Sequence, residues 1–417
     1  MADTFTALFL AALALSVAVR LWLARRQVRH VLAHRDAVPT GFADRMPLAA
    51  HRKAADYAAA RTRFGVAGLA VDTLLLLALT LGGGLAALSG FWQAHLDGLW
   101  HGLALILSVL AISSAVDVPL AAWRQFVIEQ RFGFNRMTPA LFVADLAKGA
   151  ALGAAIGTPL VLAVLWLMAA MGEYWWLYVW GFWCAFNLLL LFVWPTWIAP
   201  LFNKFAPLAD GETKTRVEAL LARCGFRSGG LFVMDGSKRS AHGNAYFTGF
   251  GDNKRIVFFD TLLERLEPAE IEAVLAHELG HFRHRHVQQR MALAFAASLV
   301  FLAILGQLAD APWFFAGLGV ADAAAHGQAM ALVLFFLAVP AFAFPLTPLG
   351  SLLSRRNEFE ADRYAAAHAR ADDLVRALVK LYEDNAATLT PDPLHSLFYD
   401  SHPPAAIRIA RLRQAGA

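Results

Sequence analysis

The chain has 417 residues, of which 58% are hydrophobic and only 16% are charged, and its mean hydropathy is +0.50. Soluble domains carry about 25% charged residues, so this composition excludes an ordinary soluble protein and indicates a chain embedded in a lipid bilayer. The formal net charge of +4 says little about partners by itself, and no nucleic-acid partner is expected.

Apolar runs long enough to cross a bilayer recur along the whole chain. About 20 apolar residues in a helix span a hydrocarbon core of roughly 30 Å. In chain order, the runs are Phe5–Val19, Leu74–Phe91, Gly102–Ile112, Leu152–Met171, Tyr174–Trp197, Met291–Leu308 and Met330–Leu353. We therefore predict seven spans. The third approaches Asp117 and Pro119, and the seventh contains prolines, which are tolerated where neighbouring helices or a wet cavity satisfy the freed backbone.

The basic residues alternate between the segments that join these runs. The segment after the first run is rich in arginine, the segment Gln93–Trp100 has no lysine or arginine, and the alternation continues to an arginine-rich tail that begins at Arg355. Because basic connections stay on the cytoplasmic side, we predict an N-terminus outside and a cytoplasmic polar stretch after Lys204. The alanine- and arginine-rich composition favours a bacterial inner membrane, whereas a eukaryotic source would place the chain in the endoplasmic reticulum membrane. A monomer is expected.

The polar stretch has the patterning of a small soluble unit. Thr213–Cys224 is predicted to be an amphipathic helix, and Gly230–Met234 a short apolar strand. Asn244–Phe250 and Arg255–Asp260 flank a Gly-Asp-Asn-Lys segment, which predicts a β-hairpin. A further helix is predicted to begin at Pro268, with glutamates in its first turn, and to lead into the sixth span.

That last helix carries an H-E-x-x-H motif, His277–His281. Residues four apart share one face of a helix, so both imidazoles can bind one metal ion while Glu278 reaches the water bound to it. The alternative is a solvated helix face with two histidines and a glutamate. The motif favours a zinc peptidase site with Glu278 as general base.

A catalytic zinc needs a third protein ligand and an open position for water. The extended metzincin motif would need glycine and histidine where this chain has His284 and Val287, so that class is excluded. Glu358 on a later predicted helix, about Arg355–His368, supplies a carboxylate ligand, with Asp362 one turn away on the same face. Asp362 would accept a hydrogen bond from a ligating imidazole.

Glu360 is the rival third ligand, but it points away from the face of Glu358 and Asp362 and has no matching partner in the sequence pattern. The alternative, without a role in metal binding, is that Glu358 and Asp362 are surface carboxylates near arginines. His284 and His286 are interpreted as part of a basic cytoplasmic rim.

These motifs together resemble one family, the integral-membrane zinc proteases of the M48 class, and specifically the Ste24-type CAAX prenyl endopeptidases. Beyond the metal motif, the segments that carry the resemblance are Phe126–Asn135, Pro200–Phe205, Asp235–Ser240, Asn244–Phe247, and His402–Pro404 followed by Arg408. They keep their order from about residue 124 to the end. The first 120 residues resemble the family in topology only.

The resemblance implies a mainly α, multi-pass membrane fold with seven transmembrane helices around a chamber. A small cytoplasmic gluzincin-like catalytic part would contain the β-hairpin. The expected organisation is residues 1–200 with five spans, 201–288 as the cytoplasmic catalytic part, 289–353 with spans six and seven, and 354–417 as the C-terminal catalytic part.

The resemblance also implies roles for individual residues. His277, His281 and Glu358 would bind one zinc ion per chain, and Glu278 would be the catalytic acid and base. His402 and Arg408 would stabilise the reaction intermediate or the substrate carbonyl; read without the resemblance, they are a loop histidine and a solvated arginine. Asn244–Phe247 would be an edge strand that pairs with the substrate backbone, with Asn244 as the residue to test, although an ordinary hairpin fits the same pattern.

Several functions remain open for such a chain. Its substrate would be a peptide or protein cleaved near the C-terminus of a CAAX sequence, possibly prenylated, or membrane proteins cleared in quality control without prenyl dependence. Asp72 and Asp117 lie within or beside apolar spans, where carboxylates usually face a bundle interior or wet cavity. A cavity of that kind also admits a zinc-regulated transporter or channel, which predicts solute flux independent of Glu278.

Overall fold

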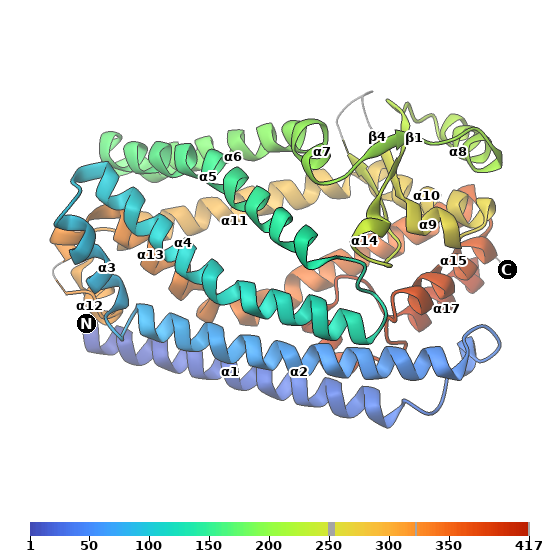
Figure 1. Ribbon diagram of the computed structural model, residues 1–417, viewed down its shortest axis with the longest axis horizontal. Coiled ribbons are helices and arrows are strands. Elements are labelled where there is room, and N and C mark those ends of the chain that lie inside the picture. The colour runs from blue at the N-terminus through green and yellow to red at the C-terminus, as the bar shows by residue number, and fades with distance from the viewer. Residues whose placement is uncertain (249–254, 322, 416–417) are drawn as a thin grey trace.

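The computed structural model describes residues 1–248, 255–321 and 323–415, and it is an elongated bundle of long helices with a small sheet near one end (Figure 1). Among the described residues, seven helices are long and apolar enough to cross a membrane. They are α1 (Ala2–Ala33), α2 (Leu48–Leu79), α4 (Gly98–Trp123), α5 (Pro139–Ala170), α6 (Trp175–Val193), α11 (His286–Leu308) and α13 (Ala323–Ala343), which continues through a 3-10 turn into α14 (Thr347–His368). The prediction of seven spans is confirmed.

Several of these helices are longer than the bilayer is thick. A helix of 32 residues, such as α1 or α2, is about 48 Å long, which exceeds a hydrocarbon core of roughly 30 Å. Most of the basic residues that follow the first apolar run lie within these two helices, Arg25 in α1 and Arg61 in α2 among them. Both helices therefore contain charged residues as well as an apolar stretch.

The predicted second span, Leu74–Phe91, is wrong in its bounds. The helix α2 ends at Leu79, and a separate short helix, α3 (Gly84–Gln93), follows after a tight turn. Gly83 adopts a φ of 77° in this turn, a left-handed conformation that glycine reaches without strain. The apolar run is therefore divided between two helices, and the spanning helix lies mostly before it.

The third and seventh spans contain the irregularities that their sequences predict. The helix α4 keeps Pro119 inside and continues as a π-helix, Arg124–Glu129. In the seventh span, Pro345 lies in the 3-10 turn Phe344–Leu346 between α13 and α14. In the most apolar 18-residue stretch of this span, 56% of the residues are buried, against 6% to 22% in the corresponding stretches of the other six spans. The helix α13 is thus the central helix of the bundle.

The remaining elements form the part that carries the metal-binding motif. Its strands are β1 (Phe205–Pro207), β2 (Leu231–Met234), β3 (Ala245–Thr248) and β4 (Arg255–Phe259), and its helices are α8 (Glu212–Arg223), α9 (Asp260–Arg265), α10 (Pro268–Arg283), α15 (Ala371–Asp384), α16 (Pro393–Tyr399) and α17 (Ala405–Ala415). Two short helices complete the chain, α7 (Ala199–Phe202) and α12 (Pro312–Gly317). A core of buried side chains from β2, β4, α8, α10, α15 and α17 holds this part together.

The sheet has the order β1-β2-β4-β3, so β3 is an edge strand. β3 pairs with β4 in antiparallel register, from Ala245 opposite Phe258 to Thr248 opposite Arg255. The predicted hairpin is therefore confirmed for its strands. The last two residues of the expected first strand, 249 and 250, and the turn at 251–254 lie outside the described residues.

The helix α10 begins where its sequence predicts, at a capping box. The side chain of Glu267 accepts a hydrogen bond from the backbone of Glu270, and the side chain of Glu270 accepts one from the backbone N–H of Glu267 at 2.9 Å. Lys380 of α15 also contacts Glu270, with its Nζ 2.7 Å from the carboxylate. These contacts fix the start of α10 and therefore the rotation of its H-E-x-x-H face.

Gly280 lets α10 pack closely on α14. A Cβ atom on Gly280 would lie 2.8 Å from the Cα of Ala361 and 3.0 Å from the Cβ of Tyr364. The two helices therefore approach each other closely at the glycine inside the motif.

We predict that Gly280→Ala destabilises the protein, because the added methyl group must push α14 away from α10. Overpacking of this kind costs about 1–3 kcal/mol. The measurement is the apparent thermal midpoint of the detergent-solubilised chain. Gly153→Ala in α5 is the control, because a Cβ there meets nothing within 4 Å. Equal midpoints for the two variants would contradict the prediction.

Candidate metal centre

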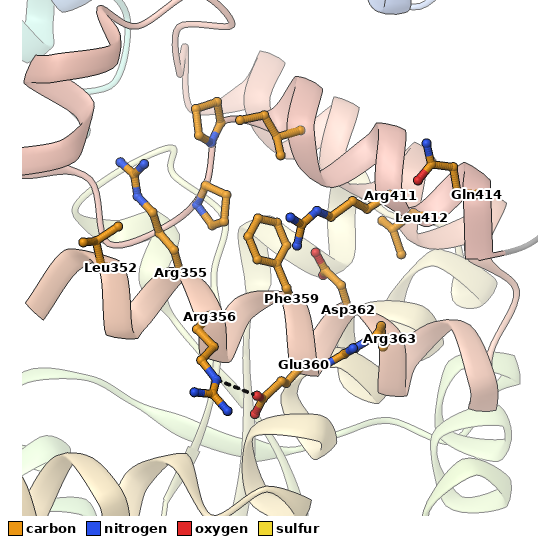
Figure 2. A pocket seen from close by; sticks show the side chains of 13 residues that line it. Leu352, Arg355, Arg356, Phe359, Glu360, Asp362, Arg363, Arg411, Leu412 and Gln414 are labelled. Atoms are coloured by element: carbon orange, nitrogen blue, oxygen red, sulfur yellow. Dashed lines mark hydrogen bonds and ion pairs between the residues drawn. The ribbon is translucent and has the colours of Figure 1, made fainter. Parts of the chain in front are cut away.

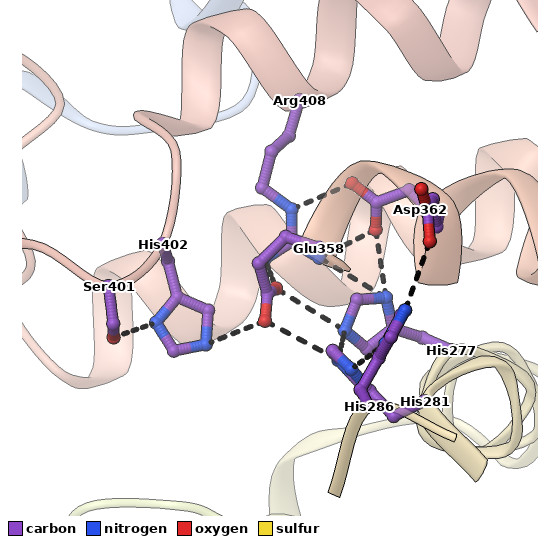
Figure 3. A network of polar contacts seen from close by, with 9 residues as sticks. His277, His281, His286, Glu358, Asp362, Ser401, His402 and Arg408 are labelled. Carbon is purple, nitrogen blue, oxygen red and sulfur yellow. Dashed lines mark hydrogen bonds and ion pairs between the residues drawn. The ribbon is translucent and has the colours of Figure 1, made fainter. Parts of the chain in front are cut away.

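Two helices that are far apart in the sequence bring three potential metal ligands together. His277 and His281 lie on α10, and Glu358 lies on the facing side of α14. The Nε2 atoms of the two histidines are 3.2 Å apart, and each lies 3.4 Å from an oxygen of Glu358 (Figure 3). One nitrogen or oxygen from each residue falls within a group whose members all lie within 4.8 Å of one another.

These distances fit a tetrahedral zinc ion. Bonds of about 2.0–2.1 Å at tetrahedral angles place neighbouring ligand atoms about 3.4 Å apart. The Oε2 atom of Glu358 is buried and accepts no hydrogen bond, so it is free to bind a cation. Two imidazoles and one carboxylate leave a fourth position for water, as catalytic zinc sites require.

Asp362 lies behind His277, as the spacing of the sequence predicts. Its Oδ1 atom is 2.9 Å from the Nδ1 atom of His277, so the other ring nitrogen of the histidine faces Glu358. Burial by itself would lower the pKa of His277, but the neighbouring carboxylates of Asp362 and Glu358 raise this pKa to about 9. An environment that stabilises a positive imidazole also stabilises a bound cation.

Arg408 is buried beside the same carboxylates. Its guanidinium donates two hydrogen bonds to Asp362, at 2.9 Å and 2.6 Å, and its Nη1 atom lies 3.5 Å from Glu358. The interpretation of Arg408 as a solvated surface residue is therefore wrong. It belongs to the charged network, where it holds Asp362 against His277.

His402 contacts the metal site from the side that is exposed to solvent. Its side chain is 60% exposed, and its Nε2 atom lies 3.4 Å from Oε1 of Glu358 (Figure 3). The Oγ atom of Ser401 lies 3.0 Å from the other ring nitrogen. Unlike Arg408, His402 has an exposed ring that a substrate can contact.

Glu278 and Asn244 are the two remaining residues of the predicted site. Glu278 follows His277 on α10 and is half-buried. Asn244 lies immediately before the edge strand β3, and its side chain is exposed. Its backbone carbonyl accepts a hydrogen bond from the backbone N–H of Phe259 at 2.9 Å. Asn244 and His402 line the same cavity, of ≈ 1310 Å³, whose opposite wall includes Tyr57 and Glu129 of the helical bundle.

The interpretation of His286 as part of a basic surface rim is wrong. His286 is fully buried, and its two ring nitrogens lie 2.9 Å from Nδ1 of His281 and 3.1 Å from Oε2 of Glu360. Glu360 therefore has a partner that the sequence pattern did not reveal. Its other oxygen accepts a hydrogen bond from Arg356 at 3.1 Å, the contact that Figure 2 marks.

Asp72 and Asp117 face a second, smaller cavity inside the bundle. It has a volume of ≈ 320 Å³ and is lined by Arg20 as well as by both carboxylates. This placement agrees with the expectation that carboxylates within spans face a cavity.

Comparison with known proteins gives a consistent result along the whole chain. Residues 27–204 match the family described as CAAX prenyl protease N-terminal, five membrane helices, and residues 207–415 match peptidase family M48. The CAAX prenyl protease 1 homolog of Oryza sativa is 38% identical over 320 residues, which are 76% of this chain and 74% of that protein.

Relatives from other organisms give similar matches. The CAAX prenyl protease 1 homolog of Caenorhabditis elegans is 33% identical over 437 residues and covers 97% of both chains. The CAAX prenyl protease 1 of Saccharomyces cerevisiae is 36% identical over 72% of this chain and 70% of its own length. The crystal structure of Ste24p from S. mikatae superposes with a TM-score of 0.91 at 28% identity, over 98% of this chain and 99% of the other.

We predict that Glu358→Ala abolishes tight binding of one zinc ion per chain, because only two imidazoles would remain as ligands. The measurement is the zinc content of the purified variant after dialysis. Glu264→Ala, which removes an exposed glutamate of α9, is the control and is expected to keep one ion. A Glu358→Ala variant that retains a full equivalent of zinc would exclude Glu358 as the third ligand.

Proposed function

The chain belongs to peptidase family M48 as a membrane-embedded metalloendopeptidase, and from this premise we propose that its metal is zinc, held by His277, His281 and Glu358. The observation that carries the proposal is a group of three donor atoms, one from each residue, that all lie within 4.8 Å of one another. The two histidine Nε2 atoms are 3.2 Å apart, and each is 3.4 Å from one of the two oxygens of Glu358, a spacing that suits the ligands of one zinc ion. The conclusion is a zinc-dependent endopeptidase that acts from within a membrane.

Glu278 is the proposed general base and acid. Zinc, when bound, would lower the pKa of a bound water towards neutrality and polarise the scissile carbonyl. Glu278 stands one residue after a proposed ligand on the same helix, so its carboxylate can take the proton of that water and pass it to the leaving amine. No other residue of the motif combines a half-buried carboxylate with that position.

His402 and Arg408 are proposed to support the reaction in different ways. The exposed ring of His402, on the open side of Glu358, can donate a hydrogen bond to the substrate carbonyl as negative charge develops. Arg408 is committed to Asp362 by two hydrogen bonds, so it is proposed to stabilise the site mainly by balancing the charge of the two buried carboxylates.

The edge strand β3 is the proposed binding surface for the substrate backbone. An edge strand presents unpaired N–H and C=O groups, to which an extended peptide adds as a further strand. Asn244 stands at the start of this strand and lines the cavity that His402 also lines. A peptide extended along β3 would therefore run past the proposed zinc ligands.

The proposed substrates are proteins cleaved near the C-terminus of a CAAX sequence. The support is that the curated relatives at 33% to 38% identity are described as CAAX prenyl proteases. The competing proposal is cleavage of membrane proteins in quality control, without dependence on a prenyl group.

The proposed arrangement in the membrane follows the distribution of arginine and lysine. It places the N-terminus outside and the catalytic part in the cytoplasm. The alanine- and arginine-rich composition favours a bacterial inner membrane, and the alternative, for a eukaryotic source, is the endoplasmic reticulum membrane. The protein is proposed to act as a monomer, because each chain supplies all three ligands of its metal site.

We predict that Glu278→Gln keeps the zinc ion but loses peptidase activity, because glutamine preserves the shape of the side chain and cannot accept the proton of the water. Loss of a general base lowers the rate by about 10²–10⁴-fold. The measurement combines zinc content with the rate of cleavage of a fluorogenic peptide. A zinc-loaded variant with full activity would refute the role of Glu278.

A second prediction concerns the lipid group of the substrate. We expect a farnesylated CAAX peptide to be cleaved with a higher kcat/KM than the same peptide without the farnesyl group, because the apolar chain adds binding energy. The measurement is the ratio of the two values for the detergent-solubilised enzyme. Equal values, with both cleavages abolished by Glu278→Gln, would favour the quality-control role.

A further inference from the structure

A second chain of hydrogen bonds lies behind His281, on the side opposite the proposed zinc ion. We propose that Glu360 and His286 form a relay that fixes the orientation and tautomer of His281, and that His286 is therefore a positioning residue for the metal centre. The inference rests on the proposed function, because it assumes that His281 binds the metal.

The contacts of His286 are those of a built network rather than of a surface residue. The ring is fully buried, and both of its nitrogens have a partner, His281 at 2.9 Å and Glu360 at 3.1 Å. Glu360 in turn accepts a hydrogen bond from Arg356 with its other oxygen (Figure 2). The side chain of Arg356 is 77% exposed, so the network runs from the metal site to the protein surface.

The backbone before His286 is unusual in a way that serves this contact. Arg285 has a φ of 57°, one of two non-glycine residues with positive φ among the described residues. A left-handed conformation is unfavourable for a non-glycine residue and persists only where its surroundings determine it. The turn at Arg285 joins α10 to α11, and His286, the first residue of α11, lies within hydrogen-bond distance of His281.

Once a metal is bound, the positions of the atoms allow only one assignment of the ring hydrogens of His281 and His286. Nε2 of His281 faces the other ligands and must offer its lone pair to the ion. Its Nδ1 then carries the hydrogen and donates to Nδ1 of His286. Nε2 of His286 in turn carries a hydrogen and donates to the carboxylate of Glu360. Every donor has an acceptor, and both histidines are neutral.

The two metal-binding histidines are thus supported in parallel. His277 donates directly to Asp362, which Arg408 holds. His281 reaches Glu360 through one additional imidazole, and Arg356 holds that carboxylate. Carboxylate partners of this kind raise the basicity of the ligand, and their removal weakens metal affinity by about 10–100-fold.

The experiment compares the zinc affinity of His286→Ala with that of the unchanged chain, measured by competition with a chromophoric chelator on the detergent-solubilised protein. We expect a zinc affinity about 10–100-fold weaker for His286→Ala. His286→Asn keeps an oxygen acceptor at the position of Nδ1 and is expected to recover most of the affinity. His284→Ala is the matched control, because it removes an exposed imidazole that stacks on His286, with ring centroids 5.6 Å apart, but is not one of the hydrogen-bonding groups of the relay.

The absorption spectrum of the cobalt(II)-substituted protein provides a second measurement, because it reports the geometry of the ligands directly. We expect His286→Ala to shift this spectrum and His284→Ala to leave it unchanged. If His286→Ala fails to fold, Glu360→Leu tests the same relay of hydrogen bonds. It removes the acceptor of His286 and is expected to weaken zinc binding. A folded His286→Ala or Glu360→Leu variant with the zinc affinity and cobalt spectrum of His284→Ala would overturn the relay.

These outcomes are separate from a failure of the proposed function. If Glu358→Ala retains zinc, the ligand assignment itself is wrong. If Glu358→Ala loses zinc while His286→Ala and Glu360→Leu bind it normally, the metal centre stands and only the relay is excluded.

Discussion

The close packing of α10 on α14 is the contact on which the metal centre depends. Gly280 leaves room for the backbone of Ala361, and this approach brings Glu358 to within 3.4 Å of both histidines of the motif. The contact also places Asp362 behind His277 and Glu360 behind His286. A wider separation of α10 and α14 would weaken these contacts together, because all three carboxylates belong to α14.

Burial of so many charged groups is stable only because they compensate one another. A buried carboxylate or guanidinium without a partner is strongly destabilising. Here Arg408 faces both Asp362 and Glu358, and the environment of His277 favours positive charge strongly enough to raise its pKa to about 9. The same balance suits a divalent cation, so the charge pattern that a bound metal requires is already present in the fold.

The helical bundle and the small sheet meet at the large cavity. Its walls combine Asn244 beside the edge strand and His402 beside the metal site with Tyr57 and Glu129 from the bundle. The hydroxyl of Tyr57 lies 2.8 Å from both oxygens of Glu129, so this wall also is held by a buried polar contact. Residues of the helical bundle and of the catalytic part therefore line one common cavity.

The sequence by itself determined the class of protein, the number of spans and the metal motif, because hydropathy, helical periodicity and residue spacing are local properties. It also indicated Glu358 and Asp362, since residues four apart share a helix face. The bounds of the second span, the burial of Arg408 and the partnership of His286 with Glu360 were decided only by the tertiary structure. His286 and Glu360 are 74 positions apart, and their contact depends on the left-handed turn at Arg285 and on the packing of α10 against α14. No local pattern records such a contact, because it follows from the relative placement of whole helices.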